Sequence, residues 1–238
     1  MNWKQFDQQR WQFLRYARRE FRRALSKQTA MVVQSLKDKG AHDTEGAIDL
    51  LVDKKPMEEA FLRVYRRVGS HFGRQTFRQF AKSEDDTWTQ NVMNAVLTQN
   101  YDKIEGISKT TKDKIKLILQ AGVRDGLGID EIARQIRDKA GGMNRATLIA
   151  RTEIISASNL GSIEGARATG LPMKKIWLAT MDNITRDIHM SADGQKTETL
   201  EGSFSVGGEN LGYPGDSSRG ASAGNVINCR CAIGYEPY

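Results

Sequence analysis

The sequence predicts an α+β protein, with a mostly α-helical N-terminal region over residues 1–142 and a small α+β module over residues 143–238 that contains a short antiparallel sheet. Three observations support this fold class. Apolar residues recur at helical spacing up to about residue 169. Twelve of the 22 glycines lie after residue 150. The runs that favour β-strands all follow Pro172.

Six helices are expected before Gly170, and each is bounded by Gly, Pro or a polar capping residue. The first covers residues 3–38 and breaks at Gly40, before a polar turn at His42–Thr44. Pro56 fits the first turn of the second helix, with Asp53 or a nearby residue as its cap. The second helix is expected to end at Phe80, and the third to run from the capping box Ser83–Asp86 to Tyr101. The fourth is expected from about Thr110 to Gly126, and the fifth over residues 130–139. Asn144 is expected to cap the sixth, which ends at Gly170.

The C-terminal module is expected to contain three strands. Two of them are long, over residues 174–180 and 226–233, and residues 204–206 form a short third strand. The segment 207–224 is rich in Gly and Ser and reads as a loop. The last helix is expected to pack against these strands.

Composition excludes some classes of protein. No apolar run approaches the roughly 18 residues that a transmembrane helix needs. The basic N-terminal segment lacks the continuous apolar core of a signal peptide, which argues against Sec export. The two cysteines are two residues apart, a poor spacing for a disulfide, and this favours a reducing compartment.

The positive charge is concentrated at the N-terminus. Residues 1–30 carry eight Lys and Arg against two acidic residues, whereas residues 151–238 sum to −2. A basic stretch interleaved with aromatic residues suits an acidic partner, such as nucleic acid or a negatively charged protein surface. The alternative is an amphipathic helix whose arginines are merely solvated. The candidate contact residues are Arg15, Arg18, Arg19, Arg22 and Arg23.

The module gathers residues that bind metals. Cys229 and Cys231 would point to the same side of a strand, and His189 with an acid, Asp182 or Asp193, would complete a tetrahedral Zn²⁺ site. The usual zinc spacing is C-x₂-C rather than C-x-C. The alternative is that both thiols are small buried side chains and that the histidine is hydrogen-bonded in a turn.

The same residues suggest a catalytic alternative. A thiol, a histidine and an acid form the general arrangement of an activated nucleophile, so Asp182, His189 and Cys229 could serve a small metal- or thiol-dependent nuclease or hydrolase. No second histidine is near in sequence and no oxyanion motif is visible. The prediction is therefore a non-enzymatic protein.

A second polar group is predicted to have a structural role. Arg151 and Glu153 are too close in sequence to face each other on a helix, so each needs a partner elsewhere. We expect a polar clamp that ties the last helix to the module, formed by Arg151, Glu153, Asn159, Asp193 and Asn228.

The order of these motifs over about residues 145–235 resembles the phage head morphogenesis (minor head) family related to protein F of phage Mu. The motifs are, in chain order, Arg151 to Glu153, Asn159, Gly161, Trp177, Asp182, Arg186, His189, Asp193 to Gln195, Phe204, Tyr213 to Asp216, and Asn228 to Cys231. The helical N-terminal part resembles the family only in being helical and charged.

The resemblance implies a minor component of the heads of tailed phages, acting in head morphogenesis and in DNA packaging or ejection. The implied partners are the portal protein, capsid or scaffold proteins, and DNA bound without sequence specificity. The implied location is inside the virion, after synthesis in the host cytoplasm. The family supplies no agreed catalytic role for the Asp, His and Cys positions.

Overall fold

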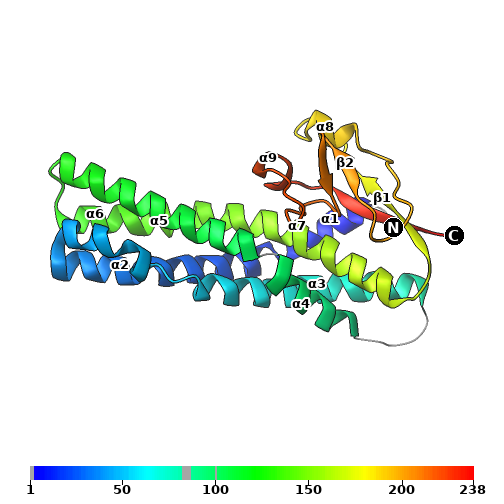
Figure 1. The fold of residues 1–238 in the computed structure, drawn as a ribbon, viewed down its shortest axis with the longest axis horizontal. Coiled ribbons are helices and arrows are strands. Elements are labelled where there is room, and N and C mark those ends of the chain that lie inside the picture. Colours follow the sequence, from blue (N-terminus) through cyan, green and yellow to red (C-terminus); the bar gives the residue numbers. More distant parts are fainter. Residues whose placement is uncertain (1–2, 82–86, 100) are drawn as a thin grey trace. The chain divides into compact units, whose positions relative to one another are not determined.

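A computed structural model describes residues 3–81, 87–99 and 101–238 (Figure 1). The expected α+β class is confirmed: long helices precede a small module with short antiparallel strands. The helices up to Gly170 are α1 (Trp3–Gln12), α2 (Leu14–Leu51), α3 (Lys55–Phe80), α4 (Thr87–Gln99), α5 (Tyr101–Arg124), α6 (Ile129–Gln135), the π-helical η1 (Ile136–Ala140) and α7 (Met143–Ala168). The later elements are β1 (Met173–Leu178), α8 (Asp187–Met190), β2 (Phe204–Val206), β3 (Glu209–Leu211), α9 (Ala223–Val226) and β4 (Ala232–Pro237).

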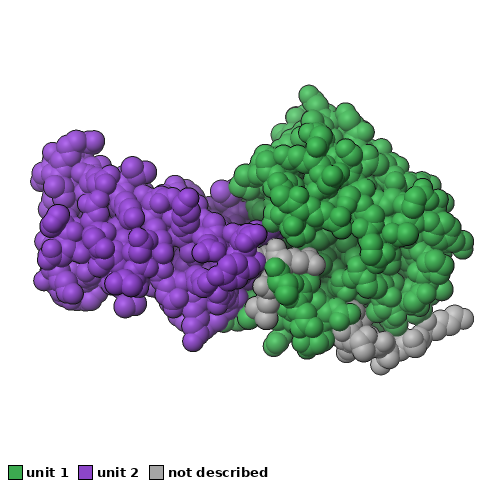
Figure 2. Space-filling model, viewed as in Figure 1, with its two compact units in different colours: residues 1–15, 62–100, 151–238 green, residues 16–61, 101–150 purple. Residues whose placement is uncertain are grey.

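The chain divides into two compact units, shown in Figure 2. Unit 1 contains residues 1–15, 62–100 and 151–238, and unit 2 contains residues 16–61 and 101–150. Unit 1 therefore combines the N-terminal helix with the C-terminal module. The domain boundary between residues 142 and 143 stays a prediction. None of the described helices is long and apolar enough to cross a membrane.

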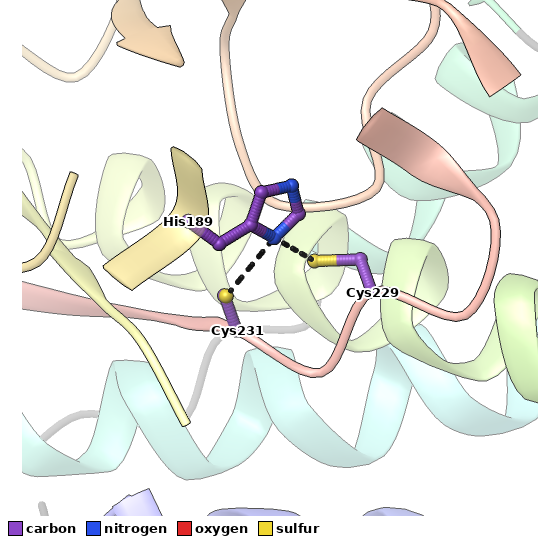
Figure 3. A group of neighbouring side chains, drawn as sticks. All are labelled: His189, Cys229 and Cys231. Atoms are coloured by element: carbon purple, nitrogen blue, oxygen red, sulfur yellow. Dashed lines mark hydrogen bonds between the residues drawn. The ribbon is translucent and has the colours of Figure 1, made fainter. Parts of the chain in front are cut away.

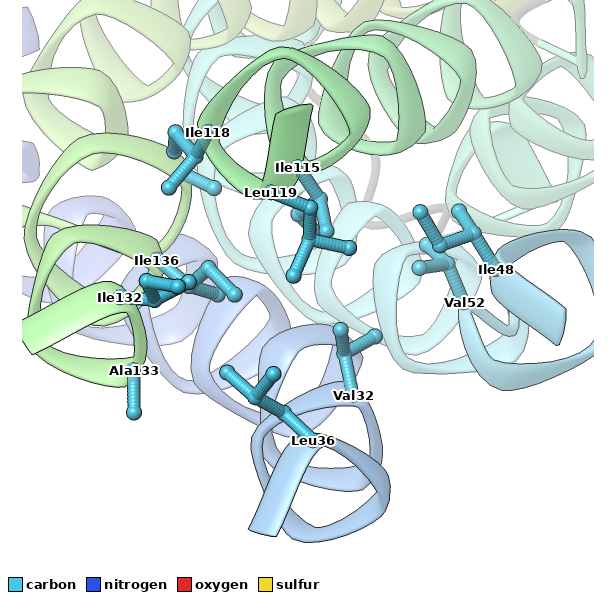
Figure 4. Packing of buried hydrophobic residues seen from close by; sticks show 11 residues of the cluster. Val32, Leu36, Ile48, Val52, Ile115, Ile118, Leu119, Ile132, Ala133 and Ile136 are labelled. Atoms are coloured by element: carbon cyan, nitrogen blue, oxygen red, sulfur yellow. The ribbon is translucent and has the colours of Figure 1, made fainter. Parts of the chain in front are cut away.

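Unit 2 is a helical unit with an aliphatic core (Figure 4). Its buried side chains come from α2, α5, α6 and η1, together with the residue that follows α2. They are Val32, Leu36, Ile48, Val52, Ile115, Ile118, Leu119, Ile132, Ala133, Ile136 and Ala140. The helical spacing of these residues explains why the sequence predicts helices here.

Several helix boundaries follow the prediction. Gly40 has φ 80° and interrupts α2, as expected. Pro56 lies in the first turn of α3, and the Asp53 carboxylate accepts a hydrogen bond from the backbone N–H of Lys55 at 3.0 Å. Gly170 ends α7 with φ 68°. The capping box at residues 83–86 lies outside the described residues.

Several local predictions are wrong. The helix expected over residues 3–38 is interrupted at Phe13, between α1 and α2, and the loop expected over residues 207–224 contains β3. The helix resumes after Gly40 instead of turning, since the Thr44 hydroxyl is buried and donates to the Gly40 carbonyl at 2.7 Å. The fourth helix begins at Tyr101 rather than near residue 110, so Tyr101 does not belong to the third helix. Asn144 lies inside α7 and is not its cap, because the Ala146 N–H already bonds the Gly142 carbonyl.

A further error concerns the second long strand. Residues 223–226 form α9, and β4 begins only at Ala232. β4 pairs antiparallel with β1, and Trp177 lies opposite Ile233. The other strand predictions are confirmed: β1 covers most of residues 174–180, and β2 covers residues 204–206. β2 and β3 form a separate hairpin.

Within unit 1, α3 and α7 approach at backbone distance. A Cβ added to Gly161 would lie 2.2 Å from the carbonyl oxygen of Gly69, and one added to Gly165 would lie 2.2 Å from that of Gly73. Any larger side chain at Gly161 would force the helices apart. α7 also packs against the module, because Ile155, near its middle, joins a core with Trp177, Phe204 and both cysteines.

Candidate metal centre

His189 lies on the short helix α8 in the core of the module. Its side chain is 1% exposed, and its ring meets the edge of the Trp177 indole with the ring centroids 5.7 Å apart. The backbone N–H groups of His189 and Met190 both bond the carbonyl of Arg186, which starts the helical turn. The imidazole is therefore oriented by packing rather than by solvent.

The cysteines lie on an extended segment between α9 and β4. Asn228 takes a left-handed conformation with φ 55°, which asparagine tolerates better than most residues, and its N–H donates to the Thr152 hydroxyl at 3.2 Å. Both thiols are free and 1% exposed. The turn at Asn228 takes the chain out of the strand geometry that the sequence suggested.

A buried arginine from α1 secures this segment. Arg10 is fully buried. It donates to the carbonyls of Arg230 and Cys231, both at 3.1 Å, and to the side chains of Ser158 and Asn159, both at 2.8 Å. These carbonyls therefore bond a side chain instead of a neighbouring strand, which explains why the predicted strand begins late.

The burial of Arg10 has an electrostatic cost. Removal from water lowers the pKa of its guanidinium to about 10, and the opposing influences of Asp7 and the two thiols are smaller. Arg10 belongs to none of the motifs that indicated a site. A signal was present, because Arg10 falls at helical spacing between Phe6 and Phe13 on the apolar face of the first helix.

The imidazole and the two thiols converge (Figure 3). The Nδ1 atom of His189 lies 3.6 Å from the Sγ atom of Cys229 and 3.5 Å from that of Cys231. All three potential ligand atoms lie within 4.8 Å of one another. In a tetrahedral zinc site, bond lengths of about 2.0–2.1 Å to nitrogen and 2.3 Å to sulfur separate N and S by about 3.5–3.6 Å. The observed distances fit such an ion.

The hydrogen bonds around Asn225 fix the tautomer of His189. The Asn225 side-chain N–H₂ group donates to Glu209 at 2.6 Å and to the Val206 carbonyl at 3.1 Å, so its oxygen must face the histidine. That oxygen lies 3.0 Å from His189 Nε2, which must then carry the proton. The lone pair of Nδ1 consequently points toward the thiols. Metal-binding histidines usually donate the N–H of their other ring nitrogen to such a partner, which fixes the orientation of the ring.

The two thiols interact with each other. The pKa of Cys231 falls to about 5, chiefly because the Cys229 thiol donates a hydrogen bond to its thiolate. The same interaction, together with burial, raises the pKa of Cys229 well above its usual value. A thiolate is the form in which cysteine binds metals and attacks electrophiles.

The family described as phage Mu protein F like protein matches residues 113–234 of this sequence. The chain belongs to this family. Over 127 residues, 52% of this chain and 40% of the relative, it is 30% identical to the minor head protein GP7 of Bacillus phage SPP1. Over 114 residues, 46% of this chain and 23% of the relative, it is 33% identical to the NAD(+)–arginine ADP-ribosyltransferase EFV of Enterococcus faecalis. The aligned parts thus span less than half of either relative. No solved structure matches.

Within the Mu F-like region, Asp182 has a different partner from the one predicted. Its carboxylate forms a two-pronged ion pair with Arg230, at 2.5 and 2.6 Å, and accepts a bond from the Ile184 N–H. The Arg230 guanidinium holds the pKa of Asp182 well below its usual range. In the part of the chain that the structure describes, the metal-ligand group is His189, Cys229 and Cys231, and does not include Asp182.

The predicted clamp residues of the Mu F-like module are spread over several contacts. Glu153 is buried and accepts a hydrogen bond from Tyr65 at 2.7 Å. Asn159 bonds Arg10 and the carbonyls of Pro214 and Cys231. Asp193 accepts a bond from the Ala179 N–H at 2.8 Å. Arg151 is exposed, so it has no part in a buried clamp.

The basic residues of the N-terminal region lie on α2. Arg18, Arg19, Arg22 and Arg23, all in unit 2, recur every three or four residues, opposite a buried face that includes Phe21. Arg19 and Arg23 each approach the Glu20 carboxylate, at 3.7 and 3.3 Å. Arg15 precedes them on the same helix.

Proposed function

We propose that this chain is a minor head protein of a tailed phage, acting in head morphogenesis and in the packaging or ejection of DNA. The observation that carries the proposal is membership of the Mu F-like family, together with the similarity to a phage minor head protein. Its location would be the virion, after synthesis in the host cytoplasm. Capsid or scaffold proteins and the portal protein are the expected partners.

The arginine face of α2 is the proposed contact for the portal protein or DNA. It consists of Arg18, Arg19, Arg22 and Arg23 in unit 2, of which all but the half-buried Arg18 are exposed. Arg15, in unit 1, is exposed and is a separate candidate contact. Arginine pairs well with phosphate and carboxylate groups because its guanidinium donates two parallel hydrogen bonds. Contacts to phosphates would give binding without sequence preference, and each contact would add to its salt dependence.

The salt dependence tests this contact. We expect the purified full chain to bind a DNA duplex weakly and without sequence preference, with log Kd rising linearly with log salt. Removing Arg18 and Arg22 together (R18Q/R22Q) should reduce the slope by about 2, since each phosphate contact contributes about 0.9. An exposed acidic-to-neutral change elsewhere, Asp125→Asn, is the control. DNA binding that survives molar salt would contradict phosphate contacts at this face, and an absence of DNA binding would leave the portal protein as its partner.

A bound Zn²⁺ is the proposed role of the His189, Cys229 and Cys231 group. Zinc would supply structural cross-linking between α8 and the segment before β4. The support is the fit of the N···S distances, the tautomer set by Asn225 and the near-complete burial of all three side chains. Burial argues against a catalytic ion, which needs a position open to substrate. The fourth position of the tetrahedron has no His, Cys, Asp or Glu ligand among the described residues.

The alternative function is a small metal- or thiol-dependent nuclease or hydrolase that uses Asp182, His189 and Cys229. The observation in its favour is the contact of the Cys229 Sγ atom with the His189 Nδ1 atom at 3.6 Å. The strong ion pair of Asp182 with Arg230 and the burial of both thiols argue against it. The ADP-ribosyltransferase similarity adds no support for enzymatic activity, because only 23% of that relative aligns.

The deciding experiment removes the gene from the phage or prophage that encodes it. We expect the intact chain to co-purify with heads, and its deletion to yield heads that contain less DNA or infect less efficiently. His189→Ala should weaken incorporation through loss of folding. Absence of the chain from purified heads would refute the proposal. An enzymatic activity that His189→Ala abolishes, with the melting temperature unchanged, would favour the nuclease or hydrolase.

A further inference from the structure

A pocket of about 530 Å³ opens beside the cysteine segment in unit 1. Three arginines line it, Arg151, Arg186 and Arg230, together with the apolar side chains Trp11, Leu14 and Ile184. Asn228 and Cys229 contribute the remaining lining. The arginine face of α2 does not line this pocket. A ligand of the pocket can therefore be tested independently of the proposed portal or DNA contact.

The lining of the pocket is positively charged. None of its residues is acidic and none is a lysine. The charge of Arg230 is neutralised by its ion pair with Asp182. Arg186 donates to the Ile227 carbonyl at 2.6 Å, and because a carbonyl is neutral, this bond leaves the positive charge of Arg186 in place. Arg151 is exposed. The pocket therefore presents at least two positive charges to a ligand, and their fork geometry suits a carboxylate.

One apolar side chain of the lining is strongly exposed, and the chain segment around it carries further exposed apolar side chains. Ile184 is 72% exposed, and Met181 and Ile188, in the same stretch of chain, are 57% and 40% exposed. Exposed apolar side chains gathered at a pocket usually mark a site of interaction. Trp, Met and Arg are enriched at the centres of protein interfaces, whereas Lys is depleted.

The wall of the pocket is fixed in advance. The segment that carries Asn228 and Arg230 is tied down by the Thr152 hydroxyl, by the Thr180 hydroxyl at 3.0 Å, and by buried Arg10. A site that is already ordered loses little conformational entropy when a ligand binds. The pocket is thus a preformed surface rather than a gap between mobile side chains.

We propose that this pocket binds an acidic segment of a protein partner, in which an Asp or Glu carboxylate lies next to an aliphatic side chain. The carboxylate pairs with Arg151 and Arg186, and the aliphatic group covers Ile184 and Leu14. A single strand of nucleic acid fits less well. Its binding sites use several aromatic faces for stacking, and the lining of this pocket holds one aromatic residue, Trp11.

Selection from a displayed library of random peptides on the immobilised full chain tests the proposal. Selected peptides should carry Asp or Glu beside Leu, Ile or Val. A synthetic copy of the most enriched peptide should lose about tenfold or more in affinity toward Arg151→Gln, since a charged hydrogen bond is lost. Ile184→Asn should lose several-fold. Both side chains are exposed, so melting curves should stay unchanged.

Arg22→Gln on α2 is the matched control and should leave the affinity for the peptide unchanged, whether or not the α2 face binds DNA. Oligothymidylate is the competing probe. The proposal is overturned if no acidic peptide is enriched, or if Arg151→Gln binds the peptide as tightly as the natural chain. It is also overturned if oligothymidylate binds and loses affinity in the same two variants.

Discussion

Replacing Arg10 by methionine should destabilise unit 1 strongly. The guanidinium donates four hydrogen bonds. The Arg230 carbonyl keeps a bond from Thr180, and the Cys231 carbonyl keeps one from Asn159 at 3.3 Å. The acceptor most clearly left without its donor is the buried side-chain oxygen of Asn159.

The expected loss follows from two opposing effects. A buried acceptor without a partner costs about 1–3 kcal/mol, and lost bonds from a charged donor add to this. Methionine needs no desolvation of a charge, which offsets part of the loss. We expect a net decrease of about 2–4 kcal/mol in the free energy of unfolding for Arg10→Met. Arg10→Lys should also be destabilising, because one ammonium group cannot reach acceptors on both α7 and the cysteine segment.

Urea unfolding followed by circular dichroism measures this loss, with Arg15→Met as the matched control. Arg15 is exposed, so its replacement should change stability by less than about 0.5 kcal/mol. The double variant Arg10→Met with Asn159→Ala should lose less unfolding free energy than the two single variants lose together. The difference should be about 1 kcal/mol or more, since the two residues share one hydrogen bond. Equal stability of Arg10→Met and the natural chain would refute the reasoning.

Three further predictions concern other parts of the fold. The purified chain should contain one equivalent of zinc and melt at a lower temperature after chelation. Asn225→Ala should weaken zinc binding about 10–100-fold, whereas the control Asn210→Ala, at an exposed position, should not. Burial lowers the pKa of Lys175 to about 8, so the folded state disfavours its charge; that penalty is fully present below pH 8 and is relieved as the pH rises toward the unfolded value of 10.5. Unfolding measured between pH 8 and 10 should therefore show the natural chain gaining stability relative to Lys175→Met, and a constant difference would contradict this. Gly161→Ala should destabilise the protein by more than 1 kcal/mol because its Cβ would meet α3, whereas Gly46→Ala, with open space around it, should be neutral or stabilising.

The helices were predictable because their apolar residues repeat at one period over many turns. Gly40, Pro56 and Gly170 act through backbone geometry that does not depend on distant contacts, so the boundaries at these residues are correct. The start of α5 was missed because residues 101–109 carry a weaker apolar repeat. Local rules thus determined most of the helical architecture.

The candidate site was predictable only in part. The scarcity of His and Cys in the sequence was enough to single out His189, Cys229 and Cys231, and the structure brings these three together. Asp182 was expected with them because it is near in sequence, but Arg230, 48 residues later, is its partner. Arg10 and Asn225 were missed because their roles depend on contacts with distant segments, which no local pattern reveals.

Arg10 lies far outside the Mu F-like region, yet its guanidinium supports the backbone that carries both cysteines. A fragment that begins at residue 143 would lack this guanidinium, and the carbonyls and amide that it serves would face a void. Expressing that fragment alone should therefore give a poorly ordered cysteine segment, even though every residue of the metal-ligand group is present. The N-terminal helix α1 is thus a structural part of the C-terminal module, because it stabilises the residues that lead into β4.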